Sequence, residues 1–182
     1  VVPVTIFVAA LLLFAIEPLI AKMILPWFGG SAAVWMACLL FFQTALLGGY
    51  LYAHLLATVA PRRWQWPIHV ILLVVSLAFL PAIPAAYWRP NGGESPLPLI
   101  LGLLAATIGL PFVLLASTTP LLTAWSARQR PSASSLTRLY ALSNLGSMLA
   151  LISYPVLIEP LLATRFQALS WSTIYGGFVV MA

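Results

Sequence analysis

The feature that most constrains this chain is a series of apolar runs, each about twenty residues long, the length of a helix that crosses a bilayer. Only 6% of the 182 residues are charged, and 63% are hydrophobic. Soluble domains carry about 25% charged residues, so this chain could not cover a soluble surface. A β-barrel would show short alternating segments instead of long runs. We therefore predict an all-α integral membrane bundle in which residues 1–182 form a single transmembrane domain.

We interpret six runs as membrane spans, separated by connectors rich in proline, glycine, serine or charge. The predicted spans are Val4–Leu25, Ala32–Val59, Pro67–Ile83, Leu97–Trp125, Leu136–Ile158 and Phe166–Ala182. The connectors are Pro26–Ser31, Ala60–Trp66, Pro84–Pro96, Ser126–Ser135 and Glu159–Arg165.

The basic residues of the connectors predict the orientation, because cytoplasmic loops are enriched in lysine and arginine. The second and fourth connectors, with their borders, carry Arg62, Arg63, Arg128, Arg130 and Arg138. The other connectors and borders carry Lys22, Arg89 and Arg165, the last two with Glu94 and Glu159 in the same connector. We therefore expect the even-numbered connectors and both termini on the cytoplasmic side.

Small side chains recur on single faces of several expected helices. Such residues let helices approach closely, and close approach is what packs a bundle in lipid. The predicted packing positions are Ala45, Gly49, Ala53 and Ala57 in the second run, Gly102 and Gly109 in the fourth, Gly146 and Ala150 in the fifth, and Gly176 in the sixth.

The sharpest candidate for a functional site is Glu17, which lies directly before Pro18 inside the first apolar run. Charged side chains inside the membrane are costly and mark functional sites by default. Proline removes a backbone donor and frees a carbonyl one turn earlier, so a carboxylate beside it could bind a cation or relay a proton. The alternative is that Glu17 pairs with Lys22, or with a basic group on another helix, and only fixes packing.

The Glu-Pro dipeptide recurs at Glu159, at the outer end of the fifth run. With the orientation above, Glu159 could line one outward-facing vestibule together with Glu17 and Lys22. The simpler interpretation of Glu159 is a solvated helix end.

A second group of polar residues lies in the inner halves of the fourth and fifth runs. Thr118 and Thr119 precede a proline, and Asn144 lies in the next run. Hydroxyls beside a proline break and an intramembrane amide can line a polar pocket. We favour the alternative, in which these groups satisfy one another and the freed carbonyls.

Other chemistry is not indicated. His54 and His69 have no Cys, His or carboxylate at metal-ligand spacing, so we predict no metal site and no cofactor. The single cysteine, Cys38, is expected to be a packing residue. No P-loop is found, and the excess of basic charge belongs to membrane loops rather than to a nucleic-acid surface. With three carboxylates in the whole sequence, acid–base catalysis is not expected, and we predict that the chain is not an enzyme.

Two stretches carry a resemblance to a known family. EPLIAKMILPWFGGSAAVWMACLLFFQTALLGGYLYAHLL resembles the first two helices of bacterial spermidine-synthase-like membrane proteins, also described as fused transporter/spermidine synthases. TTPLLTAW and LYALSNLGSMLALISYPVLIEP resemble the fourth and fifth helices of the same family. The matching positions are Glu17, Pro26, Gly29, Ser31, Trp35, Tyr140, Asn144, Gly146 and Glu159.

The resemblance implies a bacterial inner-membrane protein whose membrane region is similar to one half of a major-facilitator transporter. Full members of the family also carry a soluble aminopropyltransferase-like domain, and this sequence holds no Rossmann-like segment that could form one. Because the chain begins at Val1 and ends within an apolar run, we expect it to belong to a longer protein.

Two functions remain as hypotheses. The first is a membrane module that transports or handles a small cation or amine. The second is a structural or accessory subunit of a larger membrane complex, with the lipid bilayer and other membrane subunits, or a second copy, as its partners.

Overall fold

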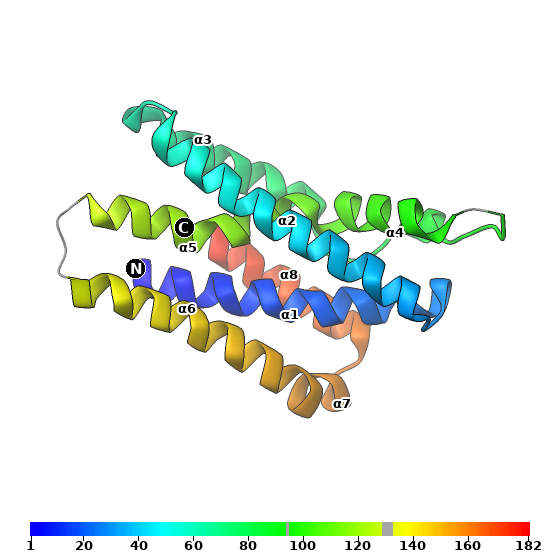
Figure 1. The fold of residues 1–182 in the computed structure, drawn as a ribbon. Helices are drawn as coiled ribbons and strands as arrows, with labels where there is room; N and C mark the ends of the chain where they lie inside the picture. The colour runs from blue at the N-terminus through cyan, green and yellow to red at the C-terminus, as the bar shows by residue number, and fades with distance from the viewer. Residues whose placement is uncertain (94, 129–132) are drawn as a thin grey trace.

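The computed structural model describes residues 1–93, 95–128 and 133–182, and this part of the chain contains helices and no strand. The prediction of an all-α fold is confirmed for these residues. Two residues of the orientation argument, Glu94 and Arg130, lie outside them. Six helical segments follow the six predicted runs in order (Figure 1).

The first, second, third and last segments are α1 (Val2–Phe28), α2 (Ala32–Thr58), α3 (Arg62–Ser76) and α8 (Thr164–Met181). The fourth is α4 (Pro96–Leu104), the π-helical η3 (Ala105–Gly109) and α5 (Leu110–Ala127), which are continuous. The fifth is α6 (Ala133–Ser153), the π-helical η4 (Tyr154–Ile158) and α7 (Glu159–Leu161). Two short 3-10 turns, η1 (Leu77–Phe79) and η2 (Ala86–Trp88), lie between α3 and α4.

Four of the segments in the described residues are long and apolar enough to cross a membrane: α1, α2, the α4–α5 segment and the α6–α7 segment. The third segment is shorter, since α3 has only 15 residues. The last segment, α8, has 18 residues and includes Arg165 and Gln167. The third and sixth predicted spans are therefore helical but less suited to cross a membrane than the other four.

The third segment also begins earlier than predicted. We expected a connector up to Trp66, because Pro67 suggested a boundary, but α3 begins at Arg62 and contains this proline. The amide of Gln65 donates hydrogen bonds to the carbonyls of Ala57 (3.2 Å) and Ala60 (2.8 Å), which closes the turn from α2. The last carbonyls of a helix lack helical partners, so these bonds stabilise the end of α2.

The basic end of α5 completes this clasp. Arg128 donates to the Ala57 carbonyl (2.7 Å) and to the Gln65 side-chain oxygen (2.8 Å). Trp125 donates to the same oxygen at 2.9 Å. Gln65, only 2% exposed, therefore has both ends of its amide satisfied.

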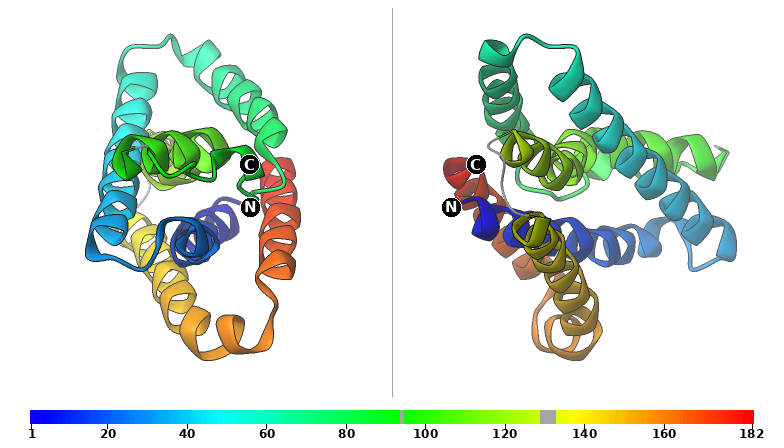
Figure 2. Two further views of the ribbon diagram at one scale, coloured as in Figure 1. Left: turned by 90° about the vertical axis from the view of Figure 1, so that its right-hand side faces the viewer. Right: turned by 60° about the vertical axis from the view of Figure 1, so that its left-hand side comes forward.

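The centre of the bundle is α1, which packs against α2, α5, α6 and α8. Figure 2 shows α6 and α8 on either side of α1, joined beyond it through α7. Ile6, Ile16, Ile20 and Ile24 are fully buried. A helix that is apolar on all sides is expected inside a bundle, so the carboxylate of α1 lies on the central helix of the fold.

Two glycines allow the closest helix approaches. A Cβ at Gly49 of α2 would lie 2.8 Å from the Val113 carbonyl oxygen of α5 and 2.6 Å from the Cβ of Ala116. A Cβ at Gly146 of α6 would lie 2.6 Å from the Phe7 carbonyl oxygen of α1 and 3.3 Å from the Cβ of Ala10. In both cases only hydrogen fits between the helices.

The other predicted packing positions differ in their surroundings. Ala53 and Ala150 are buried, whereas Ala45 and Ala57 are partly buried. A Cβ at Gly102 would lie 3.1 Å from the ring of Trp88, and a Cβ at Gly109 would be in ordinary contact, at 3.8 Å, with the Cβ of Ala105 in its own segment. Gly176 faces open space.

Candidate functional site

A pocket of about 560 Å³ lies between α1, α2 and the η4–α7 end of the fifth segment. Three of its lining residues are charged: Glu17 and Lys22 from α1 and Glu159 from α7. We call it the charged pocket. The structure thus brings together at one cavity the three charged residues that the sequence analysis grouped.

The two carboxylates of the charged pocket differ in their partners. Lys22 Nζ lies 3.0 Å from Glu159 Oε1, and their side chains are 35% and 45% exposed. Glu17, which is half-buried, has neither an ion pair nor a hydrogen bond with any residue that the structure describes. Lys22 is thus paired with Glu159 and not with Glu17, and the pocket contains one carboxyl group with an ion-pair partner and one without.

Three aromatic side chains contribute to the uncharged wall of the charged pocket, beside aliphatic residues, prolines and Cys38. Trp35 and Phe42 come from α2, and Tyr154 from the start of η4. Tyr154 and Glu159 are five residues apart, and the Glu159 amide donates to the Tyr154 carbonyl across the π-turn. The i→i+5 bonding of a π-segment brings residues five apart closer to one face than a regular α-helix does. This local geometry places both side chains on the cavity.

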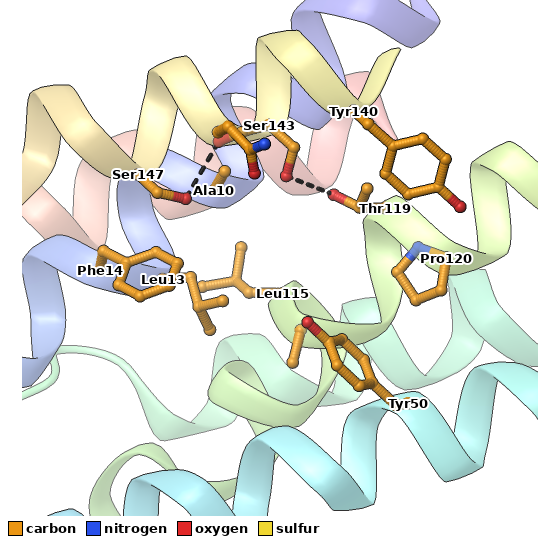
Figure 3. Close-up of a pocket in the computed structure, with 12 residues that line it drawn as sticks. Ala10, Leu13, Phe14, Tyr50, Leu115, Thr119, Pro120, Tyr140, Ser143 and Ser147 are labelled. Carbon is orange, nitrogen blue, oxygen red and sulfur yellow. Dashed lines mark hydrogen bonds between the residues drawn. The ribbon is translucent and has the colours of Figure 1, made fainter. Parts of the chain in front are cut away.

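A second pocket, of about 500 Å³, lies between α1, α2, α5 and the first half of α6 (Figure 3). We call it the neutral pocket, because its polar residues are uncharged. They are Tyr50, Thr119, Tyr140, Ser143, Asn144 and Ser147. Its opposite wall is apolar and includes Leu13 and Phe14 of α1.

The hydroxyl groups of the neutral pocket that form hydrogen bonds do so mainly with one another or with the backbone. Thr119 Oγ1 lies 3.2 Å from Ser143 Oγ, and Ser147 donates to the Ser143 carbonyl at 3.0 Å (Figure 3). Thr123 lies 3.5 Å from the Tyr140 hydroxyl. The side-chain amide of Asn144 has no hydrogen bond within the described residues, and the residue is exposed.

Of the six residues singled out from the sequence, Thr118 alone lines neither pocket. Its hydroxyl donates to the Leu114 carbonyl at 2.9 Å, and the residue is 1% exposed. Thr119 and Asn144 lie in the neutral pocket, and Glu17, Lys22 and Glu159 lie in the charged pocket.

The two pockets share three walls, since α1, α2 and the fifth segment line both. Along α1 the nearest lining residues of the two pockets are Phe14 and Glu17, which are three positions apart, or roughly 4.5 Å at the helical rise of about 1.5 Å per residue. The most apolar windows of α2 and the fifth segment are 28% and 17% buried, against 56% for α1 and for the α4–α5 segment. Both pockets thus lie beside the two least covered long helices.

The aromatic and hydroxyl partners were not identified from the sequence, although helical spacing carries a signal for them. Trp35, Cys38 and Phe42 are spaced i, i+3 and i+7, and Tyr140, Ser143, Asn144 and Ser147 are spaced i, i+3, i+4 and i+7. Such spacings place residues on one helix face. From the sequence, Cys38 is expected to pack and Asn144 to belong to a polar group, whereas Trp35 and Tyr140 enter only through the family resemblance.

The described residues contain no group of three or more His, Cys, Asp or Glu side chains placed to hold a metal ion. His69 is buried, and its Nδ1 lies 3.1 Å from the Tyr52 hydroxyl. The two pockets present charged, aromatic and hydrogen-bonding groups to a ligand.

Comparison of the chain with models of protein families, with curated proteins and with solved structures returned no match. The functional argument therefore starts from the pockets themselves.

Proposed function

We propose that this protein is a multi-pass membrane protein that binds a small organic cation, such as an amine, in the charged pocket as one step of its transport. The observation that carries this proposal is the Glu17 carboxylate, which lines the cavity without a partner among the described residues. An uncompensated charge in a membrane helix is costly. A bound cation would supply the missing charge.

The remaining walls support an organic rather than an inorganic cation. Trp35 and Phe42 line the cavity, and alkylammonium groups bind to aromatic rings by cation–π attraction. An ammonium group also donates hydrogen bonds, which a carboxylate accepts. With Lys22 held by Glu159, the three ionised groups sum to one negative charge, which matches one monocation.

For the membrane arrangement we propose six crossings with both termini in the cytoplasm of a bacterium, at the inner membrane. In Figure 1 the N-terminus lies at the same end of the bundle as the α2–α3 turn and the end of α5. Arg62, Arg63 and Arg128 belong to that end, in accord with the enrichment of basic residues in cytoplasmic loops. The charged pocket would then open toward the outer side. Membership of the spermidine-synthase-like family remains part of this proposal.

The test is uptake of a radiolabelled monoamine, propylamine, by proteoliposomes that contain the purified protein. We expect Glu17→Gln to abolish uptake above that of protein-free vesicles. Asn144→Ala, a change in the neutral pocket, should retain at least half of the wild-type rate. Equal uptake by wild type and the Glu17 variant would refute the proposal.

A second candidate function is that of an accessory subunit in a larger membrane complex. The observation that favours it is the low burial of α2 and of the fifth segment, beside which polar pockets open. Lipid cannot satisfy polar groups, so a neighbouring protein surface would stabilise this side. Native mass spectrometry of the protein extracted from its own membrane tests this candidate: a stoichiometric partner over α2 and α6 supports it, and a lone protomer contradicts it.

A further inference from the structure

The charged pocket extends well beyond the carboxylate at which the cation is proposed to bind. Glu17 and Leu25 both line it and are eight positions apart along α1, or about 12 Å at the helical rise of about 1.5 Å per residue. Its volume of about 560 Å³ lies within the range of about 300–1,000 Å³ found for sites that bind drug-sized ligands. The pocket therefore has room for more of a ligand than an ammonium group.

Most of the surface beyond the charged residues is apolar. Apart from Glu17, Lys22, Glu159 and Tyr154, the lining residues are leucines, prolines, an alanine, a phenylalanine, a tryptophan and the cysteine. Apolar surface gains from burial against another apolar group, at about 25 cal/mol per Å² removed from water. These walls favour a ligand with an aliphatic part.

Two of the lining leucines form the rim of the charged pocket. Leu39 of α2 is 55% exposed and Leu151 of α6 is 51% exposed, although both line the cavity. Leu39 lies seven positions after Ala32, where α2 begins, and Leu151 lies ten positions before Leu161, where the fifth segment ends. At about 1.5 Å per residue these positions are about 10 and 15 Å inside their helices. The rim thus lies within two segments that are long and apolar enough to cross a membrane.

The helices beside this rim are held by other neighbours. The close approach of α2 is to α5 at Gly49, and that of α6 is to α1 at Gly146. Figure 2 shows α8 on the other side of α1 from α2, so α8 does not cover this side of the pocket. The hydrocarbon core of a bilayer is about 30 Å thick. In the membrane arrangement proposed above, Leu39 and Leu151 contact acyl chains.

We propose that the ligand of the charged pocket is an amphiphilic monocation: a primary amine whose alkyl chain, longer than propyl, lies against Leu39 and Leu151. Its ammonium group binds at Glu17, the carboxylate without an ion-pair partner in the described residues. Its chain covers the apolar rim, where the surroundings are aliphatic on the protein side and on the lipid side. This inference rests on the cation site proposed above and names the class of its substrate.

The test compares three amines in equilibrium binding to the full chain in dodecyl maltoside, an uncharged detergent. They are propylamine, hexylamine and 3-ethoxypropylamine, which matches hexylamine in chain length but carries an ether oxygen. Burial of a methylene contributes about 0.8 kcal/mol, or about a fourfold gain in affinity. We expect hexylamine to bind at least tenfold more tightly than propylamine. The ether should bind at least about fivefold more weakly than hexylamine, because burying an unpaired oxygen is costly.

The outcomes separate this inference from the proposed function. If the protein binds neither propylamine nor hexylamine, the cation site is refuted and the inference falls with it. If propylamine binds and hexylamine binds no more tightly, the cation site stands and the amphiphilic ligand is excluded. Equal affinity for hexylamine and the ether would also overturn the inference, since length and not apolar contact would then set the affinity.

Variants at the rim locate the chain. Leu39→Ser and Leu151→Ser should each lower the ratio of hexylamine to propylamine affinity by at least about threefold, because each removes apolar contact. The matched controls are Leu40→Ser and Ile152→Ser, at neighbouring positions that are 52% and 56% exposed and do not line the pocket. Both should keep the wild-type ratio. Equal losses at rim and control positions would contradict the placement of the chain.

A photoreactive probe tests the placement directly. Hexylamine that carries a diazirine near the end of its chain should label peptides that contain Leu39 or Leu151. An excess of propylamine should suppress this labelling, because both amines compete for Glu17. Labelling that propylamine does not suppress, or labelling only of other peptides, would overturn the proposal.

Discussion

The charged pocket and the neutral pocket share three helical segments, and α5 lines only the neutral one, yet their polar groups are satisfied differently. In the neutral pocket, Thr119 contacts Ser143, and Ser147 binds the backbone. In the charged pocket, Lys22 compensates Glu159, and Glu17 is left without a partner in the described residues. Polar residues inside a membrane bundle therefore do not by themselves define a ligand site.

The two pockets differ because hydroxyl groups and carboxylates form different hydrogen bonds. A hydroxyl can bond to the carbonyl one turn earlier in its own helix, so serine and threonine are easily satisfied in a bundle. A carboxylate has only acceptors and cannot bind a helix carbonyl. It needs a donor or a cation from elsewhere, and Glu17 has none in the described chain.

The largest expected loss of stability comes from a substitution that disrupts both pockets at once. Gly146→Val would drive a side chain into the Phe7 carbonyl and so separate α6 from α1. We expect a loss of about 3 kcal/mol or more in the free energy of unfolding, from overpacking against backbone that cannot give way. Thermal unfolding of the purified protein measures it.

The matched control for this change is Gly176→Val, which places the same side chain on α8 in open space. This variant should differ from wild type by less than about 1 kcal/mol. If the two valine variants were equally stable, the close contact of α6 with α1 would not be what shapes the pockets.

The next prediction concerns the Lys22–Glu159 pair. Substitutions of Lys22 and of Glu159 should change the affinity for propylamine in opposite directions. Glu159→Gln frees Lys22 to approach Glu17, and we expect the affinity for propylamine to fall about tenfold, or about 1.4 kcal/mol. Lys22→Met leaves two uncompensated carboxylates and should raise the affinity by a similar factor, because opposite charges near a protein surface interact by a few kcal/mol. Equilibrium binding at low salt measures both.

Changes of the same sign in both variants would contradict this account of the charged pocket. Raising the ionic strength provides a control, because the side chains of the pair are partly exposed and salt screens such charges. The difference in propylamine affinity between Glu159→Gln and Lys22→Met should therefore narrow when NaCl is raised to about 0.5 M.

A smaller effect is expected from the neutral pocket. Ser143→Ala removes the partner of Thr119 and should cost about 1 kcal/mol of stability, the net value of a hydrogen bond. Asn144→Ala removes an amide that has no bond in the described residues and should cost less. Both variants should keep the amine affinity within about twofold of wild type, a change of roughly 0.4 kcal/mol. A tenfold loss in either would move the cation site to this pocket.

The sequence identified the elements of this fold better than their ends. The apolar runs predicted all six helical segments, because burial in a bundle and apolar composition go together. The predicted span begins at Pro67, whereas α3 begins at Arg62, where the Gln65 clasp to Ala57 and Ala60 stabilises the turn from α2. Such a clasp depends on three segments and leaves no local signature.

For the site, the sequence could identify Glu17 but not its surroundings. A carboxylate in an apolar run stands out without any structure. Which group pairs with Lys22 depends on how α7 reaches α1, and therefore on the contact at Gly146 and the π-turn at η4.

The most direct test of the central claim, that Glu17 is the uncompensated charge that binds a cation, is isothermal titration of the purified protein with propylamine. The account predicts one binding site in wild type and in Lys22→Met, and at least a 50-fold weaker interaction in Glu17→Gln, as expected when one partner of an ion pair is removed. Glu17→Gln should remain as stable as wild type, since a neutral amide replaces an uncompensated carboxylate. Binding of propylamine to a folded Glu17→Gln variant with wild-type affinity would contradict the claim.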